Sequence, residues 1–314
     1  MNQPGHEDRL ASVARQYYLE NQSKVDIGKA HGISRFQVAR LLDEARNAGI
    51  VTIEIHPPSA GRPPDSEQLQ QRLGLERIIV TPGRPAAGTG RDLLAQAVAE
   101  ELTARASAGA TIGISWSRTM DAAAERVSRL PACDLVQLAG ALPVPGSGNS
   151  VELVQQLGRI TGGETWPIWA PLVVDDSATA AGLRRQPEIA SALRKADSLD
   201  VAVVAIGGWE RQASTVWDTV GNKDRREASA AGAIAECSAR LFDSTGSPVR
   251  TNLDSRVIGV TLEQLISTPT VIGVAHGAAA ARGVLAAAQA GIITTLVADD
   301  ELTAELSRTV EQRA

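Results

Sequence analysis

The sequence has few cysteines and histidines, and this scarcity excludes several classes of protein. The two cysteines, Cys133 and Cys237, are too few and too isolated for a disulfide framework, so we expect small buried side chains in a reducing cytoplasm. The four histidines and two cysteines show no His-x-x-x-His or Cys-x-x-Cys spacing, so we expect no metal site. Because neither a Walker P-loop nor a Gly-x-Ser-x-Gly elbow is present, the sequence predicts no cofactor and no catalytic residue.

Long apolar runs and a strong positive charge are also missing. No run approaches the roughly 20 residues that a membrane helix needs, and the polar residues 1–8 lack the core of a signal peptide. We therefore expect a soluble cytoplasmic protein without a membrane partner. The net charge of -5 argues against a generally basic nucleic-acid coat protein. Even residues 1–56 are balanced, with seven Lys/Arg and seven Asp/Glu.

Two amphipathic helices are predicted on either side of a break at residues 31–34. Gly32 can adopt the left-handed conformation that ends one helix, and Ser34 is a good N-cap for the next. Ser23, three residues before Asp26, marks the start of the first helix in the same way. Two short helices joined by a tight turn with glycine are typical of a DNA-binding helix-turn-helix, which we assign to residues 1–56. The alternative is an ordinary helical hairpin in a larger helical domain.

The second helix, expected from about Arg35 to Ala48, would recognise DNA. Arginine can bind guanine through two hydrogen bonds, glutamine can do so with adenine, and serine can hold a phosphate oxygen. The candidate DNA-binding residues are Ser34, Arg35, Gln37, Val38 and Arg40. Val38 is also expected to face inward and to hold the helix on its partner. Beyond Gly49, the alternation over residues 51–55 predicts a strand and hence a winged arrangement.

Four prolines within residues 57–64 predict a semi-rigid linker, followed by an effector domain over residues 65–314. In that domain, short apolar strands alternate with helices, which indicates a Rossmann-like α/β fold with a parallel sheet covered on both faces. Strands are predicted at residues 110–114, 135–138, 172–174, 201–206, 257–260, 271–274 and 295–297. Helices are predicted at residues 65–73, 93–108, 119–130, 151–160, 187–196, 262–266, 278–290 and 301–310.

Small and polar residues follow several of these strands, where open α/β sheets bind ligands. The segment Gly113–Thr119 leaves a strand and enters a helix, so its hydroxyls and the Arg118 cation could cradle an anion. Asp243 lies in a predicted turn, where its carboxylate either caps the turn or accepts from sugar hydroxyls. The candidate effector-binding residues are Gly113, Ser115, Ser117, Arg118, Thr119, Gln137, Gly140, Gly207, Asp243, His276 and Gly277.

Short motifs stand at intervals from about residue 8 to the C-terminus. They are Gly32-Ile33-Ser34-Arg35, residues 45–51, GISWSRT at Gly113–Thr119, VQLAGAL at Val136–Leu142, APLVV at Ala170–Val174, AIGG at Ala205–Gly208, LFDSTG at Leu241–Gly246, RVIGVTLEQL at Arg256–Leu265 and VIGVAHG at Val271–Gly277. Together they resemble the SorC family of bacterial sugar-responsive transcriptional regulators, a group close to some proteins called DeoR.

The resemblance implies a winged helix-turn-helix and an effector domain similar to sugar-phosphate isomerases and glucosamine-phosphate deaminase. It also implies a homo-oligomer, dimer or tetramer, on operator DNA, whose affinity a sugar phosphate or polyol changes. By analogy the phosphate would lie on Ser117-Arg118-Thr119 and the polyol near Gln137 and Asp243.

One position departs from the family pattern. Family members often carry a lysine a few residues beyond the glycine that matches Gly277, and here that position is Ala280. A ligand with one phosphate or none is therefore expected. The leading hypothesis is a repressor of a carbohydrate or polyol catabolic operon. The alternative is a sugar-phosphate isomerase-like enzyme, for which Asp175, Asp176, Asp243 and His276 are the candidate acid and base residues.

Overall fold

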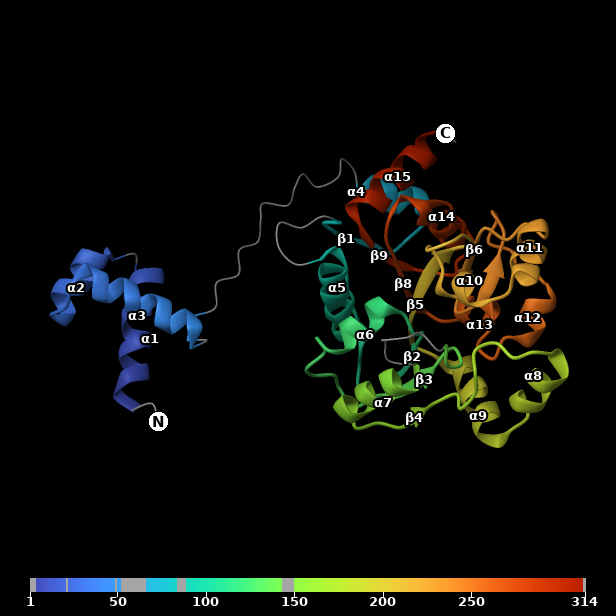
Figure 1. The fold of residues 1–314 in the computed structure, drawn as a ribbon, viewed down its shortest axis with the longest axis horizontal. Helices are drawn as coiled ribbons and strands as arrows, with labels where there is room; N and C mark the ends of the chain where they lie inside the picture. The colour runs from blue at the N-terminus through green and yellow to red at the C-terminus, as the bar shows by residue number, and fades with distance from the viewer. Residues whose placement is uncertain are drawn as a thin grey trace. The chain divides into compact units, whose positions relative to one another are not determined.

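The chain forms two compact units, one within residues 1–60 and the other within residues 61–314 (Figure 1). The computed structural model describes residues 4–20, 22–48, 50–51, 66–83, 89–142 and 150–312. The predicted linker at residues 57–64 lies outside these ranges. Within them, no helix is both long and apolar enough to cross a bilayer.

In the described part of the first unit, three helices surround a small apolar core. The helices are α1 (Pro4–Tyr18), α2 (Lys24–His31) and α3 (Arg35–Asn47). Their buried side chains are Leu10, Val13, Ala14, Ile27, Val38, Leu42 and Ala45. In α3 these residues recur at intervals of three and four, which places them on one face of the helix.

Local capping explains where these helices begin and end. The Ser23 hydroxyl accepts the Asp26 amide at the start of α2, and Gly32 ends that helix in the left-handed conformation at φ 65°. Ser34 and Gln37 then form a reciprocal capping box at the start of α3. The predicted caps are confirmed. Gly49 and residues 52–55 of the predicted wing lie outside the described residues, and Val51 packs on the helical core without strand geometry.

The second unit is built on a sheet in which the main strands run parallel. In spatial order they are β1 (Arg77–Thr81), β9 (Thr295–Asp299), β8 (Thr270–Ala275), β5 (Val201–Gly208), β2 (Thr111–Ile114), β3 (Asp134–Gln137) and β4 (Thr165–Trp166). A hairpin of β6 (Ala235–Cys237) and β7 (Arg240–Phe242) pairs antiparallel with the end of β5. The predicted parallel α/β fold is confirmed.

Helices cover both faces of this sheet, as Figure 1 shows. Alternate residues of β5 enter the two cores: Val201 and Val203 face one, Ala202 and Val204 the other. The first core holds residues from α5 (Gly90–Arg105), α6 (Arg118–Ala124) and α7 (Ser150–Thr161). The second holds residues from α4 (Ser66–Leu73), α13 (Leu262–Ile266), α14 (Ala281–Gln289) and α15 (Asp300–Glu311). The remaining helices are α8 (Ser177–Arg184), α9 (Pro187–Lys195), α10 (Thr215–Thr219), α11 (Asn222–Ala230) and α12 (Asn252–Arg256).

Some predicted elements are wrong. Residues 172–174 and 257–260 form isolated bridges, such as Val173 with Val257, instead of strands. The helix predicted at 119–130 ends at Ala124. The one predicted at 278–290 opens with a 3-10 turn at Ala278–Ala280. The strand β1 and the β6–β7 hairpin were not predicted from the sequence.

Candidate functional site

The exposed face of α3 carries most of the predicted DNA-binding residues. Ser34, Arg35, Gln37 and Arg40 are exposed. The Gln37 side-chain oxygen accepts the Ser34 amide at 2.9 Å, and the Ser34 hydroxyl accepts the Gln37 amide at 3.2 Å. These two hydrogen bonds therefore fix the start of α3, and the side chains of Arg35 and Arg40 lie exposed on the helix.

Val38 is a correction to the predicted DNA-binding set. Its side chain is 0% exposed and belongs to the core between α1, α2 and α3. A residue without accessible surface cannot touch DNA unless the unit unfolds. Val38 therefore has only the inward role that its helical spacing also predicted.

A cavity of about 460 Å³ lies at the carboxyl ends of β2, β5 and β8 in the second unit. This is the edge of the sheet where the sequence predicts ligand binding. The predicted residues that line it are Ser115, Ser117, Arg118, Thr119, Gly140, Gly207, His276 and Gly277. Segments far apart in the sequence therefore meet at one place.

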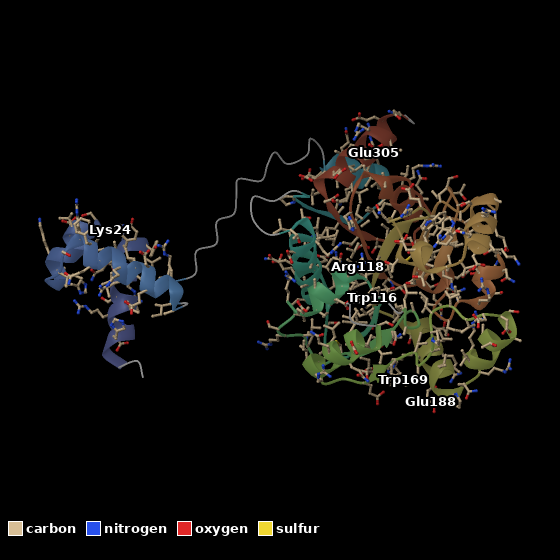
Figure 2. All side chains as sticks on the ribbon, viewed as in Figure 1. Lys24, Trp116, Arg118, Trp169, Glu188 and Glu305 are labelled. Carbon is tan, nitrogen blue, oxygen red and sulfur yellow. The ribbon has the colours of Figure 1, made fainter. Side chains whose placement is uncertain are left out.

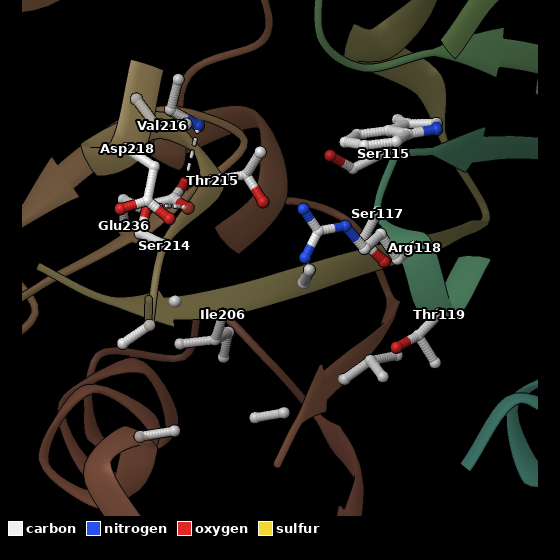
Figure 3. A pocket seen from close by; sticks show the side chains of 18 of the residues that line it. Ser115, Ser117, Arg118, Thr119, Ile206, Ser214, Thr215, Val216, Asp218 and Glu236 are labelled. Atoms are coloured by element: carbon white, nitrogen blue, oxygen red, sulfur yellow. Dashed lines mark hydrogen bonds between the residues drawn. The ribbon is translucent and has the colours of Figure 1, made fainter. Parts of the chain in front are cut away.

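The loop between β2 and α6 forms one wall of the cavity. Figure 2 shows Trp116 and Arg118 where the chain leaves β2 and enters α6. The Ser117 hydroxyl caps α6 by accepting the Met120 amide at 3.2 Å. The Trp116 indole donates to the Asp121 carboxylate at 2.9 Å and ties the loop to the helix that follows. Arg118 is left to extend into the cavity (Figure 3).

The opposite wall carries a carboxyl group that the sequence did not predict. Glu236, in β6, is 8% exposed and lines the cavity. It accepts the Ser214 hydroxyl at 2.9 Å and the Ala239 amide at 2.9 Å. Burial raises the pKa of the Glu236 carboxyl above its ordinary value, and these two hydrogen bonds oppose the shift. In Figure 3, Ser214 and Glu236 face Arg118 across the cavity.

The turn of the β6–β7 hairpin joins the two walls. Ser238 and Ala239 both have positive φ, 52° and 62°, as the type I′ form of a two-residue hairpin turn requires. The Ser238 hydroxyl donates to the Ser115 hydroxyl at 3.0 Å. The cavity thus has a continuous polar lining from the loop before α6 to Glu236.

His276 and Gly277 close the cavity beyond β8. The Gly277 amide donates to the Asp299 carboxylate at 3.1 and 3.0 Å, so it is not free for a ligand. Gly277 has φ 77°, a conformation that favours glycine. Ala280 also lines the cavity and brings no charge to it. The cationic side chains that line the cavity among the described residues are Arg91, Arg118 and Arg211.

Gln137 and Asp243 lie outside the cavity. Gln137 is 0% exposed, donates to the Ala139 carbonyl at 2.6 Å and the Ser150 hydroxyl at 2.8 Å, and accepts the Ile168 amide at 2.9 Å. Asp243 caps its own turn by accepting the Thr245 amide at 2.8 Å. The hydrogen bonds from Thr245 lower the pKa of the Asp243 carboxyl. The sequence left two roles open for Asp243, and the structure shows the first: its carboxylate caps the turn.

Three of the predicted glycines, Gly113, Gly140 and Gly207, serve close packing. A Cβ on Gly113 would lie 2.6 Å from a Leu138 methyl, so this residue supports the sheet and does not line the cavity. A Cβ on Gly140 would lie 2.7 Å from the Pro171 carbonyl oxygen. A Cβ on Gly207 would lie 3.0 Å from a Glu236 carboxylate oxygen, so a side chain there would crowd the polar wall.

Comparison with known proteins sets the class of the second unit. A family model described as "Putative sugar-binding domain" matches residues 65–306, which include every wall of the cavity. The chain is similar to the uncharacterized transcriptional regulator YjhU of Escherichia coli K12, with 25% identity over 94% of this chain and 93% of that protein. It is also similar to the transcriptional regulator LsrR of Enterobacter sp. strain 638, with 26% identity over 94% of this chain and 91% of that protein.

A solved structure extends the likeness to the whole fold. The full-length sorbitol operon regulator SorC from Klebsiella pneumoniae has a TM-score of 0.79 and 23% identity, and the match covers 97% of each chain. The chain belongs to the SorC/DeoR-like family of sugar-binding transcriptional regulators, as its motifs predicted.

Proposed function

We propose that the protein represses a carbohydrate or polyol catabolic operon in the cytoplasm. It binds operator DNA through α3 as a homo-oligomer, and an effector in the cavity of the second unit lowers its affinity for DNA. The observation that carries the proposal is the cavity itself, which sets the Arg118 cation against the buried Glu236 and Ser214. An effector changes DNA affinity only if it binds one state of the oligomer better than the other.

The lining of the cavity favours an effector with an anionic end and hydroxyl groups. A volume of about 460 Å³ suits a small sugar phosphate. Arg118 and the hydroxyls of Ser117 and Thr119 would bind the phosphate, because a guanidinium and hydroxyl donors match its oxygens. Glu236 and Ser214 would bind hydroxyls at the other end. Ala280 adds no cation, and the acids Glu210, Asp218 and Glu236 line the cavity beside its arginines, so one phosphate or none suits the site better than two.

Ligand screening tests the effector half of the proposal. Purified protein is heated with sugars, polyols and their monophosphates, and a ligand that binds only the folded state raises the melting temperature. Arg118→Ala should lose the response to a phosphorylated ligand and keep its affinity for DNA. Arg194→Ala, on α9 and outside the cavity, removes the same charge and should respond as the wild type does. An equal ligand response of Arg118→Ala and wild type would exclude Arg118 from the site.

DNA titration tests the proposed binding of operator DNA through α3. Arg35→Ala should weaken binding to a selected operator by about 1–3 kcal/mol, as expected for loss of a base-contacting arginine. Arg194→Ala is again the charge-matched control, because it changes the net charge without touching α3. A titration curve for Arg35→Ala that overlays the wild-type curve would remove Arg35 from the DNA-binding set.

An enzyme acting on sugar phosphates is the second candidate, and one observation favours it. Glu236 has a raised pKa inside a cavity, which is typical of a general acid. Of the acid and base candidates from the sequence, Asp175, Asp176 and Asp243 do not line the cavity, and His276 does. The regulator is the better proposal because the similar proteins are transcriptional regulators. Turnover of any member of a sugar-phosphate panel would favour the enzyme.

A further inference from the structure

A phenylalanine on α3, Phe36, lies on the surface outside the helical core. Phe36 is 72% exposed, whereas the only other phenylalanine of the chain, Phe242, is 0% exposed. A ring that is exposed to this extent gains little of the stabilisation that burial of an aromatic side chain provides. Its ordinary place would be in the helical core, which is filled instead by Val38 and its neighbours.

Phe36 lies at the centre of the outward face of α3. It is two residues before the buried Val38, which on a helix is about 200° around the axis. Arg40 is one turn further along the same face and is also exposed. Asp43 continues this face, and its carboxylate forms an ion pair with Arg46.

The ring is flanked by positive charge. The guanidinium carbon of Arg35 lies 4.8 Å from the centre of the Phe36 ring, within the range of a cation–π contact. This contact holds the Arg35 cation beside the ring at the start of α3. The outward face therefore presents an apolar ring between two arginines, Arg35 and Arg40. A complementary partner carries negative charges and has an apolar group between them.

We propose that Phe36 contacts the 5-methyl group of a thymine in the major groove of the operator. The proposal rests on the proposed binding of DNA through α3. Base edges in the major groove present hydrogen-bonding groups, and the thymine methyl is their apolar feature. Arg35 and Arg40 bind phosphates or guanine on either side of the ring. The ring therefore contacts a thymine that lies next to those positions.

The experiment uses the full chain and duplexes selected by it from random DNA. Each thymine of a selected duplex is replaced in turn by uracil, which lacks only the methyl group. At one thymine in each half-site, uracil should weaken binding about fourfold, the equivalent of about 0.8 kcal/mol for one buried methyl group. Phe36→Ala should bind more weakly than wild type and should bind the thymine and uracil duplexes equally.

Two further variants keep the test specific. Phe36→Leu retains an apolar side chain and should retain part of the preference for thymine. Leu19→Ala removes another exposed apolar side chain, 76% exposed, from the same unit and should leave the preference unchanged. Amide exchange of α3 in each variant shows that the helix is intact.

The outcomes are distinct. Failure to select any duplex overturns the proposed binding of DNA. A selected duplex in which uracil binds as well as thymine at every position overturns the role of Phe36 while DNA binding stands. A change in oligomeric mass of Phe36→Ala without DNA shows that a second copy of the chain covers the ring, which also overturns the proposal.

Discussion

Replacement of Gln137 by methionine separates a structural role from an effector-binding role. The side chain is fully buried and makes three hydrogen bonds, to the Ala139 carbonyl, the Ser150 hydroxyl and the Ile168 amide. Methionine has nearly the same shape but cannot replace those bonds. The carbonyl and the amide then lose this partner, and each orphaned buried group costs about 1–3 kcal/mol. We expect Gln137→Met to lower the free energy of unfolding by about 2–6 kcal/mol.

Tryptophan fluorescence during denaturation with urea measures this loss. All five tryptophans lie within residues 61–314, so the signal reports the α/β unit and not the helical unit. Gln96→Met is the matched control: Gln96 is exposed and bonds only to the Glu100 side chain at 3.0 Å among the contacts described. Its free energy of unfolding should stay within about 0.5 kcal/mol of wild type.

Stability and ligand response together decide the role of Gln137. If Gln137→Met unfolds at the wild-type urea concentration and yet no longer responds to a ligand found by screening, Gln137 binds the effector, as the sequence first predicted. If the variant is destabilised and its folded form still responds, Gln137 supports the sheet below the cavity.

Two other predictions concern Glu236 and Ser34. The folded pKa of Glu236 is raised, so the native state holds its proton more tightly and loses stability as the pH rises above the unfolded value of about 4.3. Glu236→Gln stays neutral, so its free energy of unfolding should match wild type near pH 4 and exceed it increasingly toward pH 8; a constant difference between pH 4 and pH 8 would contradict this. Ser34→Ala removes the cap of α3 and should destabilise the helical unit by about 1 kcal/mol, seen as faster amide exchange at Gln37 with tryptophan-detected unfolding unchanged. Exchange at the wild-type rate would show that the cap is dispensable.

The sequence predicts those features that depend on near neighbours. The Gly32 turn and the Ser34 cap are set by residues within one helical turn, and both are as expected. Residues Ser115–Thr119 line the cavity, as the sequence predicts, because a strand that leads into a helix fixes which edge of the sheet its loop occupies. The motifs that resemble the SorC family lie along the whole chain, and the family is confirmed.

The structure differs from the sequence prediction where contacts between distant segments place a residue. Gln137 follows a buried strand, as a ligand-binding residue would, but Ser150 and Ile168 from distant segments occupy its amide. Glu236 was missed because β6 has only three residues and its turn, Ser238-Ala239, contains no glycine or asparagine to signal a hairpin. Neither the partners of the Gln137 amide nor the place of Glu236 in the cavity wall can be read from a short window of sequence.

The pairing of β1 with β9 determines when the α/β unit can form. Arg77 of β1 pairs with Thr295 of β9, and β1 is at the edge of the described sheet with β9 as its neighbour. A ribosome makes more than 200 further residues after β1 before that pairing is possible, whereas the described core of the helical unit lies within residues 10–51. Loss of residues 295–299 would therefore deprive β1 of its partner, and the α/β unit would fail to form while helices α1, α2 and α3 still folded.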